Sequence, residues 1–235
     1  MKKIISVSLL SLFMTSAWAD TSLENIDVEE GNVVALKVGT LGLGIDYSIP
    51  VDNDFSVRFN LNGATYSEDD ITVDNIDYSG ELNLFTVGAL LDYYPYEENT
   101  FRLTGGAYYN GNNFKGSSRP TIYRDIKIGE NSYNANVIAK LDADLDFNPI
   151  SPYIGIGWGN KTTVQKGWGF SLDIGVLYQG EAEVNLTPDI NPLLRGTFVE
   201  TEINRNIEKE SKQIIEDIQG YTFYPVIMMG ASYKF

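Results

Sequence analysis

The sequence predicts an all-β fold of about eight antiparallel strands, with one amphipathic helix inserted before the last strand. The main observation is that apolar and polar residues alternate with a period of two in segment after segment, which is typical of strands whose two faces meet different environments. In the C-terminal stretch 221–235, the odd positions from Phe223 to Phe235 are nearly all apolar or aromatic. The chain also has no cysteine, so it lacks the disulfides that small secreted domains usually need.

The N-terminal residues 1–19 have the features of a secretory signal peptide. Two lysines precede an apolar run, and an A-x-A cleavage site ends at Ala19. The apolar run is shorter than the roughly 20 residues that a transmembrane helix requires. We expect cleavage after Ala19, followed by a flexible acidic leader over residues 20–32.

The remaining residues, 33–235, are expected to form one domain, in which 188–220 is an inserted loop plus helix. No later segment is apolar for long enough to cross a membrane as a helix, so any crossing must use strands closed into a barrel. The net charge of −15 argues against nucleic acid as a partner, because phosphates require a basic surface. A transmembrane, up-and-down antiparallel β-barrel is therefore the predicted architecture.

Each strand is predicted from its own alternation or from flanking turn residues. Strand two, for example, sets Phe55, Val57 and Phe59 against Ser56 and Arg58. The expected strands are approximately 33–49, 55–62, 81–96, 101–110, 137–147, 151–159, 168–179 and 221–235.

The polar faces of these strands predict a polar network inside the barrel. Arg58 stands alone amid apolar alternation, and three carboxylates share one face of the segment 137–147. Such groups need water or partners of opposite charge. The predicted lumen residues are Arg58, Glu81, Arg102, Lys140, Asp142, Asp144 and Asp146.

Aromatic residues at strand ends predict belts at the two membrane interfaces. The predicted belt residues are Tyr93, Tyr94, Tyr96, Trp158, Trp168 and Tyr178.

Residues 200–219 are predicted to form the inserted helix, because Ile203, Ile207, Ile214 and Ile218 fall on one stripe at helical spacing. The simpler interpretation is that this stripe packs against the barrel mouth or plugs it. The alternative is that it binds a partner or a lipid surface.

The chain has no histidine and no cysteine. The usual bases, thiol nucleophiles and zinc ligands are therefore absent, and we expect no enzymatic activity, cofactor or metal. The acidic segment 68–77 offers oxygen ligands of the kind that calcium prefers, but it lacks the EF-hand spacing, so a solvated charged loop is the preferred interpretation.

The sequence resembles the small eight-stranded outer-membrane barrels, the OmpA-, OmpX- and OmpW-like superfamily. The resemblance rests on the signal peptide, the segment 152–159 (PYIGIGWG) and the final residues 230–235 (GASYKF). It is similar in particular to an uncharacterised group from Gram-negative bacteria, through segments 38–44 and 169–180. The resemblance implies an outer-membrane location, contact with outer-membrane lipid, and recognition of the C-terminal strand, with Tyr233 and Phe235, by the barrel-assembly machinery.

The expected function is that of a non-enzymatic, integral outer-membrane protein with a structural or interaction role and a largely filled polar lumen. Two alternatives stay open: a narrow, porin-like channel or carrier for small molecules, and a soluble periplasmic ligand-binding β-protein. The side of the helix 200–219 is also open. Loop lengths place it in the periplasm, whereas the C-terminal signal places both termini in the periplasm and the helix outside.

Overall fold

The computed structural model describes residues 31–235, apart from 74–75, 121–124, 129–130, 134–135, 163–164 and 219–221. The predicted signal peptide, 1–19, and the predicted leader up to residue 30 lie outside the described residues.

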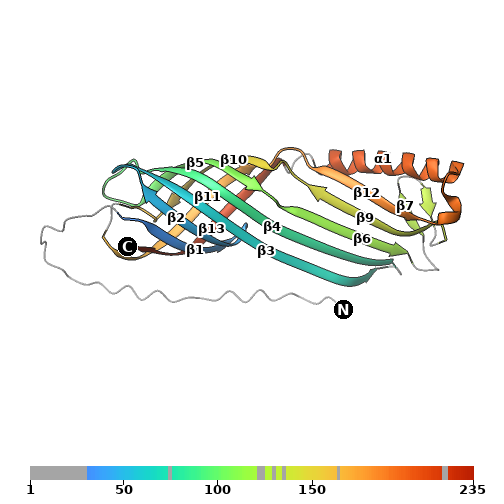
Figure 1. Ribbon diagram of the computed structural model, residues 1–235, viewed down its shortest axis with the longest axis horizontal. Helices are drawn as coiled ribbons and strands as arrows, with labels where there is room; N and C mark the ends of the chain where they lie inside the picture. The colour runs from blue at the N-terminus through green and yellow to red at the C-terminus, as the bar shows by residue number, and fades with distance from the viewer. Residues whose placement is uncertain are drawn as a thin grey trace, which may run out of the picture.

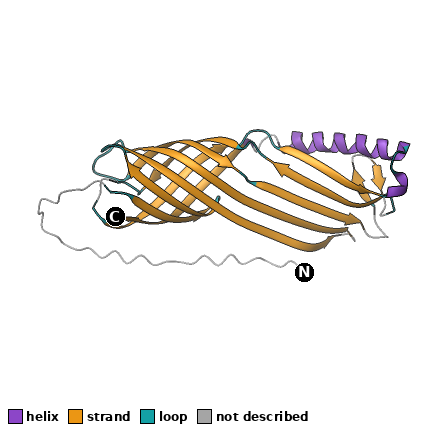
Figure 2. Cartoon of the chain, in the orientation of Figure 1, coloured by secondary structure: helices purple, strands orange, loops and turns teal. Residues whose placement is uncertain are grey.

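Strands dominate the described part of the chain, and one long helix accompanies them (Figure 2). The helix is α1 (Phe198–Ile218), and it follows the short 3-10 helix η1 (Pro192–Leu194). The strands are β1 (Val33–Gly39), β2 (Gly42–Pro50), β3 (Phe55–Val73), β4 (Ile76–Tyr93), β5 (Phe101–Asn110), β6 (Asn113–Pro120), β7 (Ile126–Ile128), β8 (Asn131–Tyr133), β9 (Ile138–Asp146), β10 (Ile150–Trp158), β11 (Gly167–Tyr178), β12 (Glu183–Ile190) and β13 (Phe223–Lys234).

Eight strands form a ring in the order β4, β3, β2, β1, β13, β11, β10 and β5, and each is paired antiparallel with both of its neighbours. The pairing of β4 with β5 completes the ring, with Thr86 opposite Asn110 and Tyr93 opposite Leu103. The first and last ring strands also pair, with Val33 opposite Lys234. Both ends of the described chain therefore lie at one end of the ring, as Figure 1 shows for the C-terminus.

The sheet continues beyond the ring at the opposite end. Strands β3 and β4 are 19 and 18 residues long, and only part of each pairs within the ring. The remaining half of β4 pairs with β6, which is followed in the sheet by β9 and β12. We call the overhanging halves of β3 and β4, together with β6, β9 and β12, the extension; it occupies the half of the molecule away from the C-terminus (Figure 1).

The two faces of β4 exchange their polarity between the ring and the extension. In the ring, Val87 is exposed on the outside, and Asp92 is fully buried on the inside. In the extension, the outer face carries Glu81, and the inner face carries Leu82. A ring that is apolar outside and polar inside thus becomes a sheet that is polar outside and apolar inside.

The helix α1 covers part of the apolar face of the extension. Ile203 and Ile207 on the helix pack with Ile138 and Ile190, which lie on neighbouring strands, in one buried cluster. The predicted helix 200–219 is confirmed as far as residue 218. Ile203 and Ile207 of its stripe pack in this cluster on the extension rather than against the ring. Among the described helices, none combines the length and apolarity needed to cross a membrane.

Two strand predictions are wrong in their details. The predicted strand 33–49 is a hairpin of two strands, because Gly42 has a φ of +91° and lets the chain reverse at Thr40 and Leu41. The segment 137–147, predicted as a ring strand, forms β9 in the extension. The prediction is wrong because alternation shows that a segment has two different faces but does not show which strands are its neighbours.

The hairpin also removes the conflict over loop length. The end of the ring that holds the C-terminus carries the connections 51–54, 94–100 and 159–166. The opposite end carries the tight turn 40–41 and all of the chain that forms the extension. Three compact connections and both ends of the described part of the chain therefore share one end of the ring.

Candidate functional site

The candidate site is a layer of six charged side chains inside the ring, which we call the ion layer. Each residue comes from a different ring strand, and each points inward because it occupies the polar phase of its strand's alternation. Three cations face three anions, and all six residues are at most 5% exposed. The ion layer consists of Lys37, Asp46, Arg58, Asp92, Arg102 and Asp173.

Arg58 is the centre of the ion layer. Its Nε and Nη2 donate hydrogen bonds of 2.7 and 3.0 Å to the two carboxylate oxygens of Asp92. Its Nη1 lies 3.0 Å from Asp46 and 3.2 Å from Asp173. The contact with Asp92 is bidentate, and bidentate arginine–carboxylate contacts are among the strongest hydrogen bonds in proteins. Arg58 thus joins carboxylates from three other strands.

The other two cations complete the ion layer. Arg102 Nη2 lies 2.5 Å from Asp173 Oδ1, and Arg102 Nη1 donates to the Gly159 carbonyl oxygen at 2.6 Å. Lys37 Nζ lies 2.7 Å from Asp173 Oδ2 and also contacts Asp46. The charges therefore balance, as they must where both partners are removed from water.

Glycine provides the space for the Arg102 guanidinium. A Cβ atom at Gly157 would lie 2.8 Å from Arg102 Cζ and 2.6 Å from the Leu172 carbonyl oxygen. Both distances are shorter than real Cβ contacts. The absence of a side chain at Gly157, in the glycine-rich end of β10, therefore leaves the space in which the Arg102 side chain of β5 is buried.

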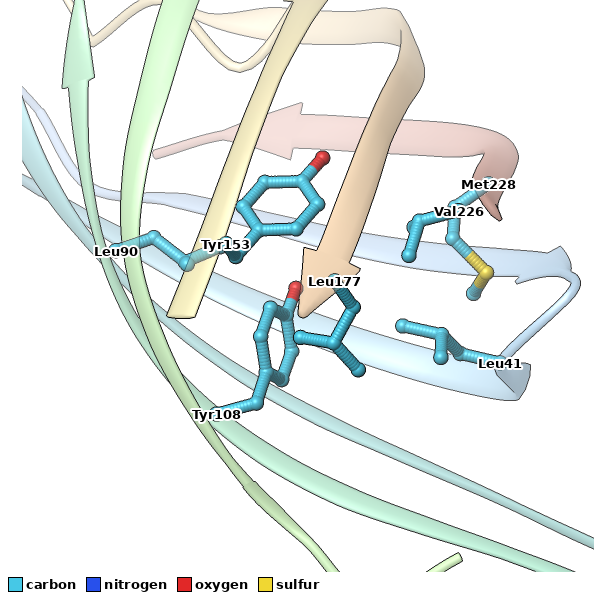
Figure 3. Close-up of a cluster of buried hydrophobic side chains, with 7 residues drawn as sticks. All are labelled: Leu41, Leu90, Tyr108, Tyr153, Leu177, Val226 and Met228. Carbon is cyan, nitrogen blue, oxygen red and sulfur yellow. The ribbon is translucent and has the colours of Figure 1, made fainter. Parts of the chain in front are cut away.

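Above the ion layer, towards the extension, lies an apolar layer (Figure 3). It consists of Leu41, Leu90, Tyr108, Tyr153, Leu177, Val226 and Met228, whose side chains point towards one another across the ring. Tyr108 and Tyr153 meet edge to face, with ring centroids 5.5 Å apart. Gly155 and Gly175 admit Tyr153, since a Cβ on either would lie 2.4 Å from its hydroxyl oxygen.

Polar side chains join the two layers to the wall of the ring. Asn60 Nδ2 donates to Asp46, and Asn62 Nδ2 donates to Thr86 Oγ1 at 2.8 Å. Thr104 Oγ1 donates to Asp92 Oδ1 at 2.6 Å. The bonds from Asn60 on β3 and Thr104 on β5 hold two carboxylates of the ion layer in place.

The end of the ring nearest the C-terminus is crossed by Tyr94, whose hydroxyl donates to the Asn160 carbonyl oxygen at 2.9 Å. Burial raises the pKa of the Tyr94 phenol to about 12, and the neighbouring Asp92 carboxylate adds to the rise. Lys161 Nζ donates to the carbonyl oxygens of Tyr96 and Glu97, both at 2.9 Å. The loops 94–100 and 159–166 are therefore tied to each other.

The predicted lumen residues divide into two groups. Arg58 and Arg102 lie in the ion layer, as the sequence predicts. The other five lie on strand segments of the extension, which do not form part of the ring. Their assignment to the lumen is therefore wrong. These five are Glu81, Lys140, Asp142, Asp144 and Asp146.

On the extension, these carboxylates have other cationic neighbours. Lys115 is the cross-strand partner of both Glu81 and Asp144. Lys140 Nζ lies 2.6 Å from Asp142 Oδ1. They form part of the polar outer face of the extension.

Four members of the ion layer were missed from the sequence: Lys37, Asp46, Asp92 and Asp173. The signal was nevertheless present in the alternation. Asp46 stands between Ile45 and Tyr47 in the sequence, and Asp173 stands between Leu172 and Ile174. Asp142 and Asp144 have apolar neighbours in the same way, so a rule that places every such charge in the interior finds the two ring aspartates but misplaces these two on the extension.

Of the predicted belt residues, five lie with partly or largely exposed side chains on the outside of the ring or just beyond its strands: Tyr93, Tyr96, Trp158, Trp168 and Tyr178. The sixth, Tyr94, is only 2% exposed, and its assignment to a belt is wrong because it alternates inward after Tyr93.

Aromatic pairs mark both ends of the ring. Trp168 and Tyr233 have ring centroids 5.2 Å apart at the end with the C-terminus, where Tyr233 also contacts Phe235. Tyr178 and Phe223 have centroids 5.4 Å apart at the other end. The prediction that the acidic segment 68–77 is a loop is wrong, because residues 68–73 belong to β3 and residues 76–77 to β4. Residues 74–75 lie outside the described residues.

No protein-family model matches the chain, and no curated protein matches it in sequence. Two solved structures share its fold, the crystal structures of CarO2 and CarO from Acinetobacter baumannii. The CarO2 alignment covers 87% of this chain and 98% of that one, with a TM-score of 0.55 and 20% identity. For CarO, the coverage is 90% and 100%, with the same TM-score and identity. The likeness at this identity is one of fold.

Proposed function

We propose that the chain is an integral outer-membrane β-barrel protein with a non-enzymatic, structural or interaction role, and that the ion layer and the apolar layer close its lumen. The observation that carries the proposal is the exchange of polarity along β3 and β4. A ring with an apolar outside and charged inside suits lipid, whereas the extension, with its polar outer face, suits water.

The spacing of the aromatic pairs supports this location. Trp168 and Tyr178 are ten residues apart on β11, which is roughly 33 Å along a strand and roughly 25 Å across a bilayer at the usual tilt. That is the height of the apolar band on outer-membrane barrels. Between these residues, the outward side chains Phe170, Ile174 and Val176 are all exposed and apolar.

The exposed apolar surface of the ring argues for a barrel over the soluble periplasmic alternative. Leu43 is 70% exposed and Ile154 is 72% exposed, on strands in different parts of the ring. Apolar surface of this extent on a soluble protein would drive association. The two Acinetobacter structures support the architecture, because they share the fold of this chain.

The sidedness of the proposed barrel follows from its two ends. Compact connections normally face the periplasm, and long ones face the outside. The end that holds both ends of the described chain and the connections 51–54, 94–100 and 159–166 is then periplasmic. The extension and α1 stand on the external surface, where α1 is the element available to a partner.

The narrow-channel alternative is favoured by one observation, the polar column of Asn60, Asn62 and Thr86 that leads from the ion layer towards the extension. It requires the apolar layer to part, because Leu41 and Tyr108 lie across the same interior. Closure is therefore the resting state that we propose.

Membrane fractionation, followed by electrophoresis with and without boiling, tests the proposal. We expect recovery in the outer membrane and a change of mobility on boiling, because a small barrel stays folded in detergent until it is heated. A soluble periplasmic pool without a mobility change would contradict the proposal and favour the ligand-binding alternative.

A further inference from the structure

The inner face of the extension contains an apolar groove that the closed ring does not use. Cross-strand pairing places Tyr66, Leu82 and Phe114 in one row across β3, β4 and β6. A second row across β4, β6 and β9 consists of Tyr78, Ser118 and Leu141. Side chains of both rows line a cavity of about 470 Å³, a volume typical of small-molecule sites.

The groove exists because the row between these two is made of small residues. Gly80, Gly116 and Ala143 are successive cross-strand partners in that row. A Cβ atom at Gly116 would lie 3.3 Å from Phe114 Cε1, and one at Gly80 would lie 3.5 Å from Phe114 Cε2. The Phe114 ring therefore leans over both glycines and presents aromatic surface to the groove.

One end of the small-residue row carries a carboxylate. Glu68 is the cross-strand partner of Gly80 and lines the same cavity. The Tyr66 hydroxyl donates to Glu68 Oε2 at 3.1 Å, so the carboxylate contacts one of the tyrosines that line the groove. From Glu68 to Ala143, the row crosses three strand spacings, roughly 14 Å.

We propose that this groove binds a small organic cation with an apolar body, such as an aryl or alkyl ammonium. The row of glycines and alanine accommodates the apolar part, Phe114 and the two tyrosines offer aromatic faces to the cation, and Glu68 provides the opposite charge. The groove combines a mostly apolar lining with one carboxylate, so it selects against anions.

The experiment is calorimetric titration of the full chain in zwitterionic lipid nanodiscs, with empty nanodiscs as the blank. The probes are benzyltrimethylammonium, benzyl alcohol and benzenesulfonate, which share an aromatic body and differ in charge. We expect the cation to bind most tightly and the anion most weakly.

Two variants locate the site, and one serves as a control. Glu68→Gln removes the charge with little change of shape, and we expect it to weaken cation binding roughly fivefold to tenfold. Ala143→Leu fills the groove and should abolish binding of the cation. Glu81→Gln removes a carboxylate from the opposite face of β4 and should leave the affinity unchanged.

Three outcomes would overturn the proposal. Benzyl alcohol could bind as tightly as the cation, Glu68→Gln could leave the affinity unchanged, or Ala143→Leu could fail to reduce binding. The mobility shift on boiling is measured for every variant as a test of folding. A Glu68→Gln or Ala143→Leu protein that keeps the shift and loses affinity supports the proposal, and one that keeps both the shift and the affinity contradicts it.

Discussion

Arg58 and Asp92 are 34 residues apart in the chain, yet two nitrogens of the arginine meet both oxygens of the aspartate at 2.7 and 3.0 Å. The pair joins β3 to β4 inside the ring, at the level where the ion layer is densest. Neither residue is more than 1% exposed, so each depends on the other to offset the loss of water.

Replacing Asp92 with Asn should destabilise the ring strongly. The substitution leaves Arg58 buried with one fewer anion, and loss of one partner from a buried pair costs about 3–5 kcal/mol. The measurement is the free energy of unfolding in urea, followed by the mobility shift on gels. Asp146→Asn is the matched control, because Asp146 is exposed on the extension, and it should change stability by under about 0.5 kcal/mol. Equal effects of the two substitutions would contradict the structural role of the ion layer.

Conductance should depend on the cations of the ion layer. The native protein in a planar bilayer is expected to show no steady open-pore current. The double substitution Arg58→Ala and Arg102→Ala removes two large side chains and leaves three aspartates facing one lysine, so any current that appears should favour cations. Lys115→Ala with Lys140→Ala removes the same number of charges from the extension and should leave the bilayer silent. A native protein that conducts as freely as the arginine variant would refute closure by the ion layer.

A methyl group at Gly157 should disturb Arg102. The added Cβ would lie 2.8 Å from Arg102 Cζ, and overpacking of this kind costs about 1–3 kcal/mol. Gly105→Ala is the control, because a Cβ there meets nothing within 4 Å. Urea unfolding midpoints compare the two variants, and a Gly157→Ala midpoint equal to that of Gly105→Ala would argue against tight packing around the guanidinium.

A lysine on the outside of the ring tests whether that surface faces lipid. Ile154 is 72% exposed on β10, and Ile154→Lys should cost about 2–4 kcal/mol if the residue lies near the middle of a bilayer. Leu193 is 87% exposed beyond the ring, and Leu193→Lys should cost little. The free energies are measured on protein refolded into vesicles. A harmless Ile154→Lys would contradict the membrane location.

Much of the ring was predictable because its alternation is regular. The inserted helix and most ring strands were found, as was the burial of Arg58 and Arg102 in the interior. The extension was not predicted, because Asp142 and Asp144 alternate with apolar residues as ring residues do. Only the strand pairing shows that Asp144 lies beside Lys115 on β6. The hairpin at Thr40 was missed because apolar residues continue on both sides of the turn.

The ion layer was only half recognised for a related reason. Its members come from six strands, and each contributes one charge, so no local cluster exists in the sequence. Asp173 is 136 residues from Lys37, to which it is bonded. Local spacing does not reveal such a network; it emerges only when the alternation of each strand is combined with the strand pairing.

The unbroken course of β3 and β4 has a mechanical consequence. Since both strands run from the ring into the extension without an intervening loop, the extension has no hinge about which to swing as a tethered domain would. The extension and the ring are therefore expected to move as one body, and a force applied near α1 is transmitted through β3 and β4 to the wall of the ring. An antibody or ligand bound at the far end would therefore stay at a fixed distance from the ring.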